Sequence, residues 1–269
     1  MRIATVCALL LAPSLAAAEA GDPLSDRFSL SLGTFLLDTS TNLRVDGTGG
    51  RRGTEIDAER DLGLHNSDSF RVDGYWRFAE RHKVRLLYFD NSRHDSRTID
   101  RDITIRDTTF PLDAQVDTHF TTTVAELAYE YAFLRREHYE VAGTIGLHNL
   151  QFKLGLTAQQ TSTGGAVAEL AQNAKADGPL PVIGLRGIWR LGEQWALDAQ
   201  AQFFRIKVDP YDGRLEDYTA SVVWMPFTHV GLGAGYNEFV TRLDVSANQF
   251  EGRLRWRYGG ARIFVTASF

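Results

Sequence analysis

The chain has 269 residues, a formal net charge of −5 and 43% hydrophobic residues. This length suits one large all-β domain or two small domains, and the mildly acidic charge gives no sign of the basic face that nucleic-acid binding needs. The mean hydropathy of −0.23 is typical of a soluble protein. It does not exclude a transmembrane β-barrel, because half of each barrel strand faces a polar interior.

The first 20 residues have the pattern of a secretory signal peptide. Arg2 gives a positive start, an apolar run covers residues 3–11, and small residues precede a cleavage site after Ala18 or Ala20. Cys7 lies inside this run, so the predicted mature domain, residues 21–269, has no cysteine. After residue 20, no stretch of about 18 residues has the pattern of a transmembrane helix.

Alternation of apolar and polar residues is the main signal in the rest of the chain. Successive side chains of a strand point to opposite faces, and in residues 70–78 one face carries Phe70, Val72, Trp76 and Phe78. The same period predicts strands near residues 28–37, 68–79, 82–95, 113–134, 138–157, 181–191, 194–208, 214–226, 228–243 and 247–269.

The connections alternate between short turns and long polar segments, as periplasmic turns and extracellular loops do in outer-membrane barrels. The long ones are residues 38–67, 96–112 and 158–180, and residues 166–176 have the composition of a short helix or plug. We therefore predict an all-β fold, a single closed antiparallel transmembrane β-barrel of about ten strands. A turn at Gly259–Gly260 in place of a bulge, or a hairpin in residues 38–67, would give eight or twelve strands.

The last residues alternate as Ile263, Val265, Ala267 and Phe269 up to a terminal aromatic. This pattern resembles the insertion signal of outer-membrane proteins. The mature chain as a whole resembles small bacterial outer-membrane barrels of the outer membrane protein A or W type. The resemblance implies outer-membrane lipid and lipopolysaccharide as partners, the barrel assembly machinery during insertion, and no single activity.

On this phasing, charged side chains of both signs face the lumen. Arginine suits such a confined space, since its planar fork pairs with carboxylates through two hydrogen bonds. Two interpretations of this charged lumen are open. It is either a salt-bridged interior that conducts little, or a narrow pore with a slight excess of basic residues. The predicted lumen-lining residues are Arg71, Asp73, Arg77, Arg85, Glu126, Glu130, Arg186, Asp198, Arg253, Arg255 and Arg257.

Other candidate sites are weaker. His94 and Ser96 have the spacing of a base and nucleophile on one strand face, which resembles the His-x-Ser pair of outer-membrane lipid hydrolases without an evident acid partner. Asp57, Glu59 and Asp61 alternate as oxygen ligands of a cation would, although spacing of two is common in polar strands. We predict no metal and no cofactor.

The sequence thus favours a non-enzymatic outer-membrane barrel, either structural or a narrow solute pore. The alternatives are a lipid-modifying hydrolase centred on His94 and Ser96, and a soluble periplasmic β-sandwich that binds a ligand, because a sandwich alternates as well.

Overall fold

The computed structural model describes residues 22–65, 69–161, 167–209, 211–247 and 250–269, so the predicted signal peptide lies outside the described residues. No helix in these ranges is long and apolar enough to cross a membrane. The elements are β1 (Phe28–Val45), η1 (Thr48–Gly50), β2 (Ile56–Asp57), α1 (Ala58–Leu62), β3 (Ser69–Ala79), β4 (His82–Thr98), β5 (Ile103–Ile105), β6 (Thr108–Phe110), β7 (Gln115–Arg135), β8 (Tyr139–Thr161), β9 (Val167–Arg190), β10 (Trp195–Val208), β11 (Tyr211–Trp224), β12 (Val230–Ala247) and β13 (Phe250–Ser268).

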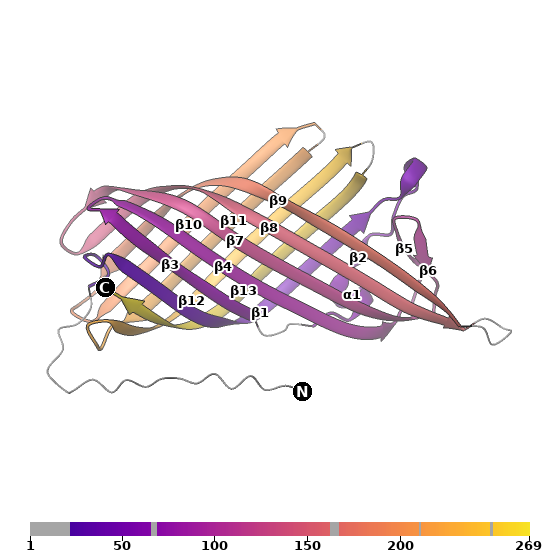
Figure 1. Ribbon diagram of the computed structural model, residues 1–269, viewed down its shortest axis with the longest axis horizontal. Coiled ribbons are helices and arrows are strands. Elements are labelled where there is room, and N and C mark those ends of the chain that lie inside the picture. Colours follow the sequence, from indigo (N-terminus) through magenta and orange to yellow (C-terminus); the bar gives the residue numbers. More distant parts are fainter. Residues whose placement is uncertain (1–21, 66–68, 162–166, 210, 248–249) are drawn as a thin grey trace.

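Ten of these strands form a closed antiparallel barrel, as the sequence predicts. Their order is β1, β3, β4, β7, β8, β9, β10, β11, β12 and β13, and β13 pairs with β1 to close the ring. The two described chain ends and the short turns lie at one end of the barrel (Figure 1). We call this the terminal end and the opposite one the far end.

The closing seam between β1 and β13 runs without a slip from Ser29, opposite Ser268, to Val45, opposite Gly252. Glycine allows the close approach of the two strands. A Cβ atom on Gly33 would lie 2.4 Å from the carbonyl oxygen of Ile263, and one on Gly260 would lie 2.2 Å from that of Leu36. No bulge interrupts β13 at Gly259–Gly260, which differs from the sequence prediction.

Two segments predicted as connections are strands. Residues 158–161 belong to β8 and residues 167–180 to β9, so residues 166–176 are not a helix over their described part. Leu170, Ala174 and Leu180 pack against the buried core on one face, while polar residues occupy the other. This packing overrides the helix propensity of the segment, since propensity is a weak prior. Likewise β1 continues beyond residue 37, because Leu43 and Val45 are buried.

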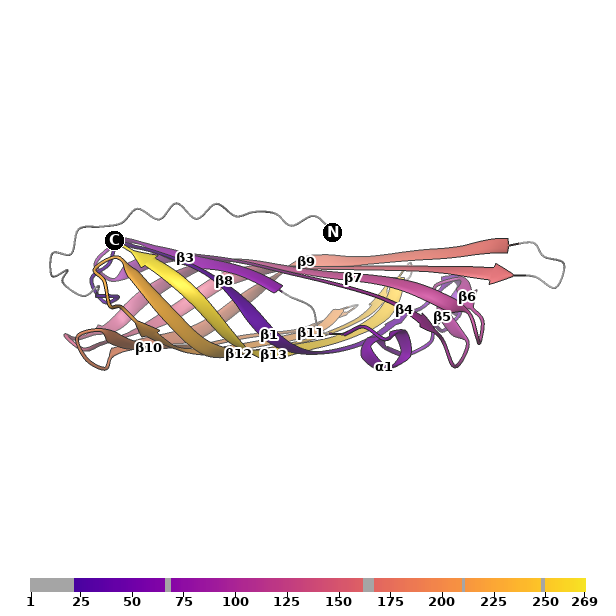
Figure 2. The ribbon, with the colours of Figure 1, turned by 90° about the horizontal axis from the view of Figure 1, so that it is seen from below.

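At the far end the barrel wall divides into two layers. β9 pairs with β10 only over Ile183–Arg190, and Pro179 and Pro181 precede this region without backbone N–H groups to extend the ladder. Beyond that point, β4, β7, β8 and β9 form one layer, and β10, β11, β12, β13 and β1 form the other. Figure 1 shows the strands of these layers diverging toward the far end, and Figure 2 shows the molecule to be flat there.

An apolar core fills the space between the two layers, with Leu154, Leu156 and Val116 on one side and Val45 and Leu215 on the other. The connection after β1 covers its edge, with Ile56 and Leu62 buried in the same cluster. α1 is a short helix with Asp57 as N-cap and Gly63 at φ 73° as C-cap.

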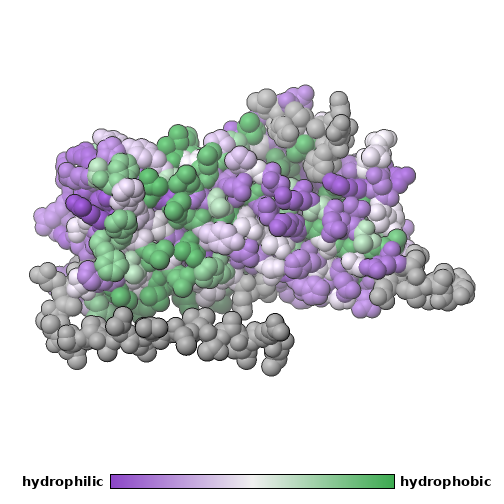
Figure 3. Space-filling view, in the orientation of Figure 1, coloured by the Kyte–Doolittle hydropathy of each residue, from purple (hydrophilic) through white to green (hydrophobic). Residues whose placement is uncertain are grey.

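The outer face carries a belt of exposed apolar side chains around the terminal half of the barrel. Figure 3 shows this belt as apolar surface next to the predominantly polar far end. We define the apolar belt by Leu30, Leu32, Leu36, Trp76, Leu86, Tyr88, Leu127, Ile145, Leu147, Ile183, Leu185, Trp195, Phe203, Tyr218, Val222, Leu232, Tyr236, Ile263 and Val265.

Candidate functional site in the barrel interior and on its outer face

Acidic and basic side chains pair across the interior at the level of the apolar belt. Nearest the terminal end, Glu140 on β8 accepts a hydrogen bond of 2.7 Å from Arg77 on β3 and also pairs with Lys83 on β4. All three side chains are nearly fully buried. Three strands are thus tied together inside the barrel by one carboxylate.

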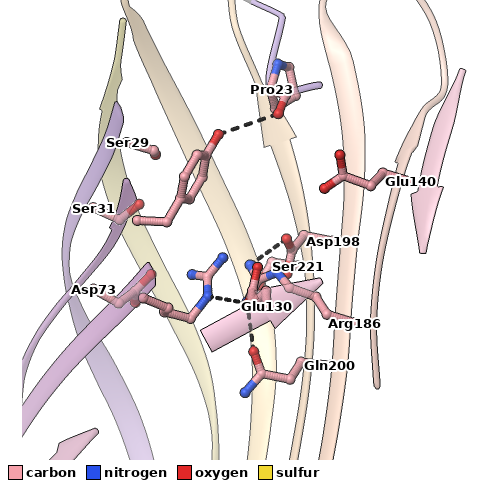
Figure 4. A network of polar contacts seen from close by, with 12 residues as sticks. Pro23, Ser29, Ser31, Asp73, Glu130, Glu140, Arg186, Asp198, Gln200 and Ser221 are labelled. Atoms are coloured by element: carbon pink, nitrogen blue, oxygen red, sulfur yellow. Dashed lines mark hydrogen bonds and ion pairs between the residues drawn. The ribbon is translucent and has the colours of Figure 1, made fainter. Parts of the chain in front are cut away.

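A second group lies next to it and connects opposite walls. Arg85 donates to Glu130 at 2.7 Å, and Arg186 lies 4.0 Å from the same carboxylate. Arg186 also pairs with Asp198 and donates to Gln200. Figure 4 shows Glu130, Arg186, Asp198 and Gln200 converging on one point between the strands.

A third group continues the network toward the middle of the barrel. Asp73 pairs with Arg71 at 2.9 Å and with Arg262 at 3.1 Å. Arg71 donates to the side-chain oxygen of Asn237, whose nitrogen donates to Asp217.

The buried imidazole of His148 belongs to the same network. Its Nε2 atom lies 3.0 Å from Gln202 and 3.4 Å from Glu126. The Gln202 amide also donates to Glu126 at 2.7 Å. His148 is therefore held by polar side chains, and the described residues contain no group of three or more His, Cys, Asp and Glu side chains arranged to hold a metal ion.

Aromatic rings lie above this network on the side of the far end. Tyr258 stacks on Phe89 with ring centroids 5.1 Å apart and on Phe239 at 5.3 Å. Trp256 packs against Phe239 and Phe152. Below the rings, a cavity of about 60 Å³ lies beside Asp73, Arg85 and Arg186, which is room for a few water molecules only.

Eight of the predicted lumen-lining residues lie in the interior, and the remaining three do not. Arg253, Arg255 and Arg257 lie on the outer face, while Trp256 and Tyr258, which each follow one of these arginines, are 2% exposed and point inward. The sequence interpretation placed them the other way round, because it allowed a bulge at Gly259–Gly260 to reverse the faces of β13. The uninterrupted pairing of β13 with β1 and β12 keeps even-numbered residues inside along the whole strand.

This correction changes the charge of the interior. With the three arginines outside, the belt-level network holds as many acidic as basic side chains and has no basic excess. The basic members are Arg71, Arg77, Lys83, Arg85, Arg186 and Arg262, and the acidic members are Asp73, Glu126, Glu130, Glu140, Asp198 and Asp217.

Comparisons with known proteins identify the architecture. No family model and no curated protein matches the chain. Among solved structures, the outer membrane protease OmpT from Escherichia coli is 13% identical, covers 92% of this chain and 98% of its own, and superposes with a TM-score of 0.56. The attachment invasion locus protein Ail of Yersinia pestis is 11% identical over 90% of this chain and 97% of its own, with a TM-score of 0.34. The likeness to OmpT shows the fold alone.

This chain has the fold of an outer-membrane β-barrel. The apolar belt is accordingly its lipid-facing surface. In barrels of this fold the end with the short turns and both chain ends is periplasmic and the opposite end is extracellular, and we name the two ends of this chain accordingly. The predicted insertion residues Ile263 and Val265 are exposed on the outer face of β13, where Ala267 is half-buried, and Phe269 is exposed directly after the strand.

His94 and Ser96 are exposed on the outer face of β4, as their parity predicts. His94 lies opposite His119 on β7, with ring centroids 6.2 Å apart, and Ser96 lies opposite Asp117. Asp117 is the acidic neighbour that the sequence does not reveal, because the length of the 96–112 connection does not fix the register of β7.

The arrangement around Ser96 is not that of an activated nucleophile. Its hydroxyl accepts a hydrogen bond of 3.1 Å from Gln115, and no hydrogen bond in the described structure joins it to His94. Ser96 also lies eight residues beyond Tyr88 of the apolar belt, which is about 26 Å along the strand. Lipid ester groups lie near the edge of the belt, far below this point.

The acidic residues of the first long connection bind protein groups. Glu59 pairs with Arg93 at 2.5 Å and accepts from the backbone of Thr41 at 2.8 Å. Burial raises the pKa of the Asp61 carboxyl, but hydrogen bonds from Arg60, the Asp57 backbone and Arg101 more than offset it and hold this pKa below its usual value. These carboxylates fix the connection over the extracellular end.

We expect Glu130→Ala to destabilise the folded barrel by roughly 3–5 kcal/mol, because it removes the carboxylate that the buried side chains of Arg85 and Arg186 share. The measurement is the urea midpoint of the detergent-folded protein by tryptophan fluorescence. Asp38→Ala, which removes a carboxylate from the exposed outer face of β1, is the control and should change little. Equal midpoints for Glu130→Ala and wild type would show that the network contributes nothing.

Asp26, just before β1 at the periplasmic end, gives a pH-dependent prediction. Burial raises the pKa of its carboxyl from 3.8 to about 6, although the nearby Ser268 side chain acts in the opposite direction. Since the folded-state pKa is the higher one, the contribution of the Asp26 carboxyl to stability is greatest below about pH 4 and is lost as the pH rises through 6.

Asp26→Asn should therefore raise the urea midpoint at pH 8, and the difference from wild type should disappear near pH 4. Glu193→Gln, on an exposed turn at the same end, serves as the control. A destabilised Asp26→Asn variant at pH 8 would contradict the burial argument.

Proposed function

We propose that this protein is a non-conducting structural barrel that carries a rigid two-layered β-platform on the extracellular side of the outer membrane. The observation that supports this most is the balanced interior network at the level of the lipid. Its twelve charged side chains come from eight strands, and ion pairs or hydrogen bonds through Asn237, Gln202 and His148 hold them in place. A solute would have to separate these pairs to pass.

Energetics favour a closed interior. Removing one partner of a buried ion pair costs roughly 3–5 kcal/mol, and an ion on this path would meet several pairs in succession. Barrels of about eight strands are just filled by their side chains, whereas about 16–18 strands leave an aqueous channel. Ten strands with arginine and aromatic side chains inside lie near the filled limit.

The extracellular half supports the same proposal. The apolar core between the two layers excludes water from the continuation of the barrel axis, with Phe110, Phe120 and Leu156 almost fully buried. Arg93, itself 1% exposed, holds the connection over this core through Glu59 and also donates to the Thr41 hydroxyl of β1. A path through the protein would therefore have to open both halves.

A protease or lipid-hydrolase activity has less support from the geometry. The likeness to OmpT extends to the fold, and the interior of the extracellular half is lined by apolar groups. His94 and Ser96 lie above the level of lipid esters and share no hydrogen bond within the described residues. We therefore propose a non-enzymatic role.

The direct test is conductance in planar lipid bilayers. We expect no discrete current steps from the purified, folded protein at either polarity, since the interior charges are mutually neutralised. Reproducible steps whose ion selectivity changes in Glu130→Gln would contradict the proposal, because that dependence would place the current path through the network. Current steps that also occur with detergent alone are not carried by the protein, and they leave the closed barrel as the explanation for the absence of any further steps.

A further inference from the structure

Four arginines lie side by side in one row across the outer face. The register pairs Arg205 of β10 with Arg214 of β11, Arg214 with Arg242 of β12, and Arg242 with Arg255 of β13. All four side chains are exposed. Neighbouring strands lie about 4.8 Å apart, so each guanidinium has another within reach of a shared ligand.

Such a row is unfavourable for the protein alone, because like charges directly opposite each other on paired strands are destabilising. Arg214 pairs with Glu216 on its own strand. Arg205, Arg242 and Arg255 have no ion pair among the described residues. Three neighbouring positive charges thus remain without a counter-charge from the protein.

The arginines beside the row are neutralised, which distinguishes them from it. Arg257 donates to Glu238 at 2.6 Å, and Arg253 donates to Asp244 at 2.6 Å. Glu238 and Asp244 are therefore used by the flanking arginines, whereas three of the four arginines in the row have no carboxylate partner among the described residues.

The row begins at the extracellular edge of the apolar belt. Arg205 follows Phe203 by two positions on the outer face of β10, and Arg214 lies four residues from Tyr218. Arg242 lies six residues beyond Tyr236. Because barrel strands are tilted, the row rises from the lipid boundary at β10 to the sugar level at β12 and β13.

Phosphate is the chemistry that this row fits. The planar guanidinium donates two parallel hydrogen bonds to phosphate oxygens, and it is more weakly hydrated than an ammonium group. Lipopolysaccharide, the lipid of the outer leaflet, carries phosphates at the acyl boundary and on the sugars directly above it. The row spans these two levels.

We propose that Arg205, Arg214, Arg242 and Arg255 form a binding site for the phosphate groups of lipopolysaccharide on the outer wall of the barrel. The site depends on the outer-membrane location and not on the closed lumen. The conductance experiment and the binding experiment can therefore fail independently of each other.

The test compares two triple variants of the full mature chain. Arg205→Gln, Arg242→Gln and Arg255→Gln together remove the unpaired charges of the row. Arg27→Gln, Arg81→Gln and Arg136→Gln together remove three exposed arginines at the periplasmic end and change the net charge equally. Both variants are first checked for the heat-modifiable band of a folded barrel.

Binding is measured in detergent with bisphosphorylated lipid A, with the same lipid after enzymatic dephosphorylation, and with inorganic phosphate. We expect the row variant to bind the phosphorylated lipid at least about tenfold more weakly than wild type, and the periplasmic variant to bind like wild type. Dephosphorylated lipid A should bind wild type as weakly as phosphorylated lipid binds the row variant.

Three results would overturn the proposal. Unchanged affinity of the row variant, or an equal loss in the periplasmic variant, would show that the row is not the site. Competition by inorganic phosphate at the concentration at which lipid A binds would show a site for free phosphate and not for the lipid. If the triple row variant fails to fold, Arg242→Gln alone is measured, and unchanged affinity in that variant overturns the proposal equally.

Discussion

The pairing of β13 with β1 is the constraint on which the other features of this barrel depend. A closed ring satisfies every backbone N–H and C=O group of the spanning strands, since lipid offers them no partner. The seam also fixes which face each residue of β13 occupies, and a shift by one residue would exchange the two faces. Gly33 and Gly260 permit the close contact that keeps this register.

The register separates two populations of arginine with different environments. Arg71, Arg85, Arg186 and Arg262 point inward, where carboxylates match them. Arg242, Arg255 and their neighbours point outward above the lipid, where part of their charge has no protein partner. Because an unpaired buried charge is costly, each interior charge has a partner, whereas the exposed outer charges are not under that constraint.

The interiors of the two halves of the barrel are filled in different ways. At the level of the lipid the interior is wide enough for long charged side chains, which fill it and pair. Beyond the lipid the wall divides where Pro179 and Pro181 end the β9–β10 ladder, and two layers close on an apolar core. An extracellular half of this kind resembles a small sandwich built on top of a barrel.

Many of the strands and inward-facing residues were predictable from the alternation of apolar and polar residues alone. The parity of Phe70, Val72 and Trp76 placed Arg71, Asp73 and Arg77 inside, because each apolar residue has a polar neighbour in that stretch. The ten strands and their closure followed from the same alternation. Residues 166–176 were ambiguous, since alanine-rich segments satisfy a helix and a half-buried strand equally well until the partner β8 is known.

The faces of β13 were not predictable, for a physical reason. Residues 253–258 alternate arginine with large apolar groups, so either face fits the interior, and only the pairing with β1 decides. The arginine row likewise depends on register across four strands, which loop lengths do not fix. Asp117 opposite Ser96 is hidden in the same way.

Single-cysteine labelling of β12 and β13 tests this register most directly. The mature chain predicted from the sequence has no cysteine, so a membrane-impermeant maleimide added to intact cells reports one position at a time. The account predicts labelling of Arg242→Cys and Arg255→Cys, and protection of Thr241→Cys and Tyr258→Cys in barrels that retain the heat-modifiable band. Labelling of the buried pair together with protection of the arginine positions would contradict the closure of β13 on β1 described above.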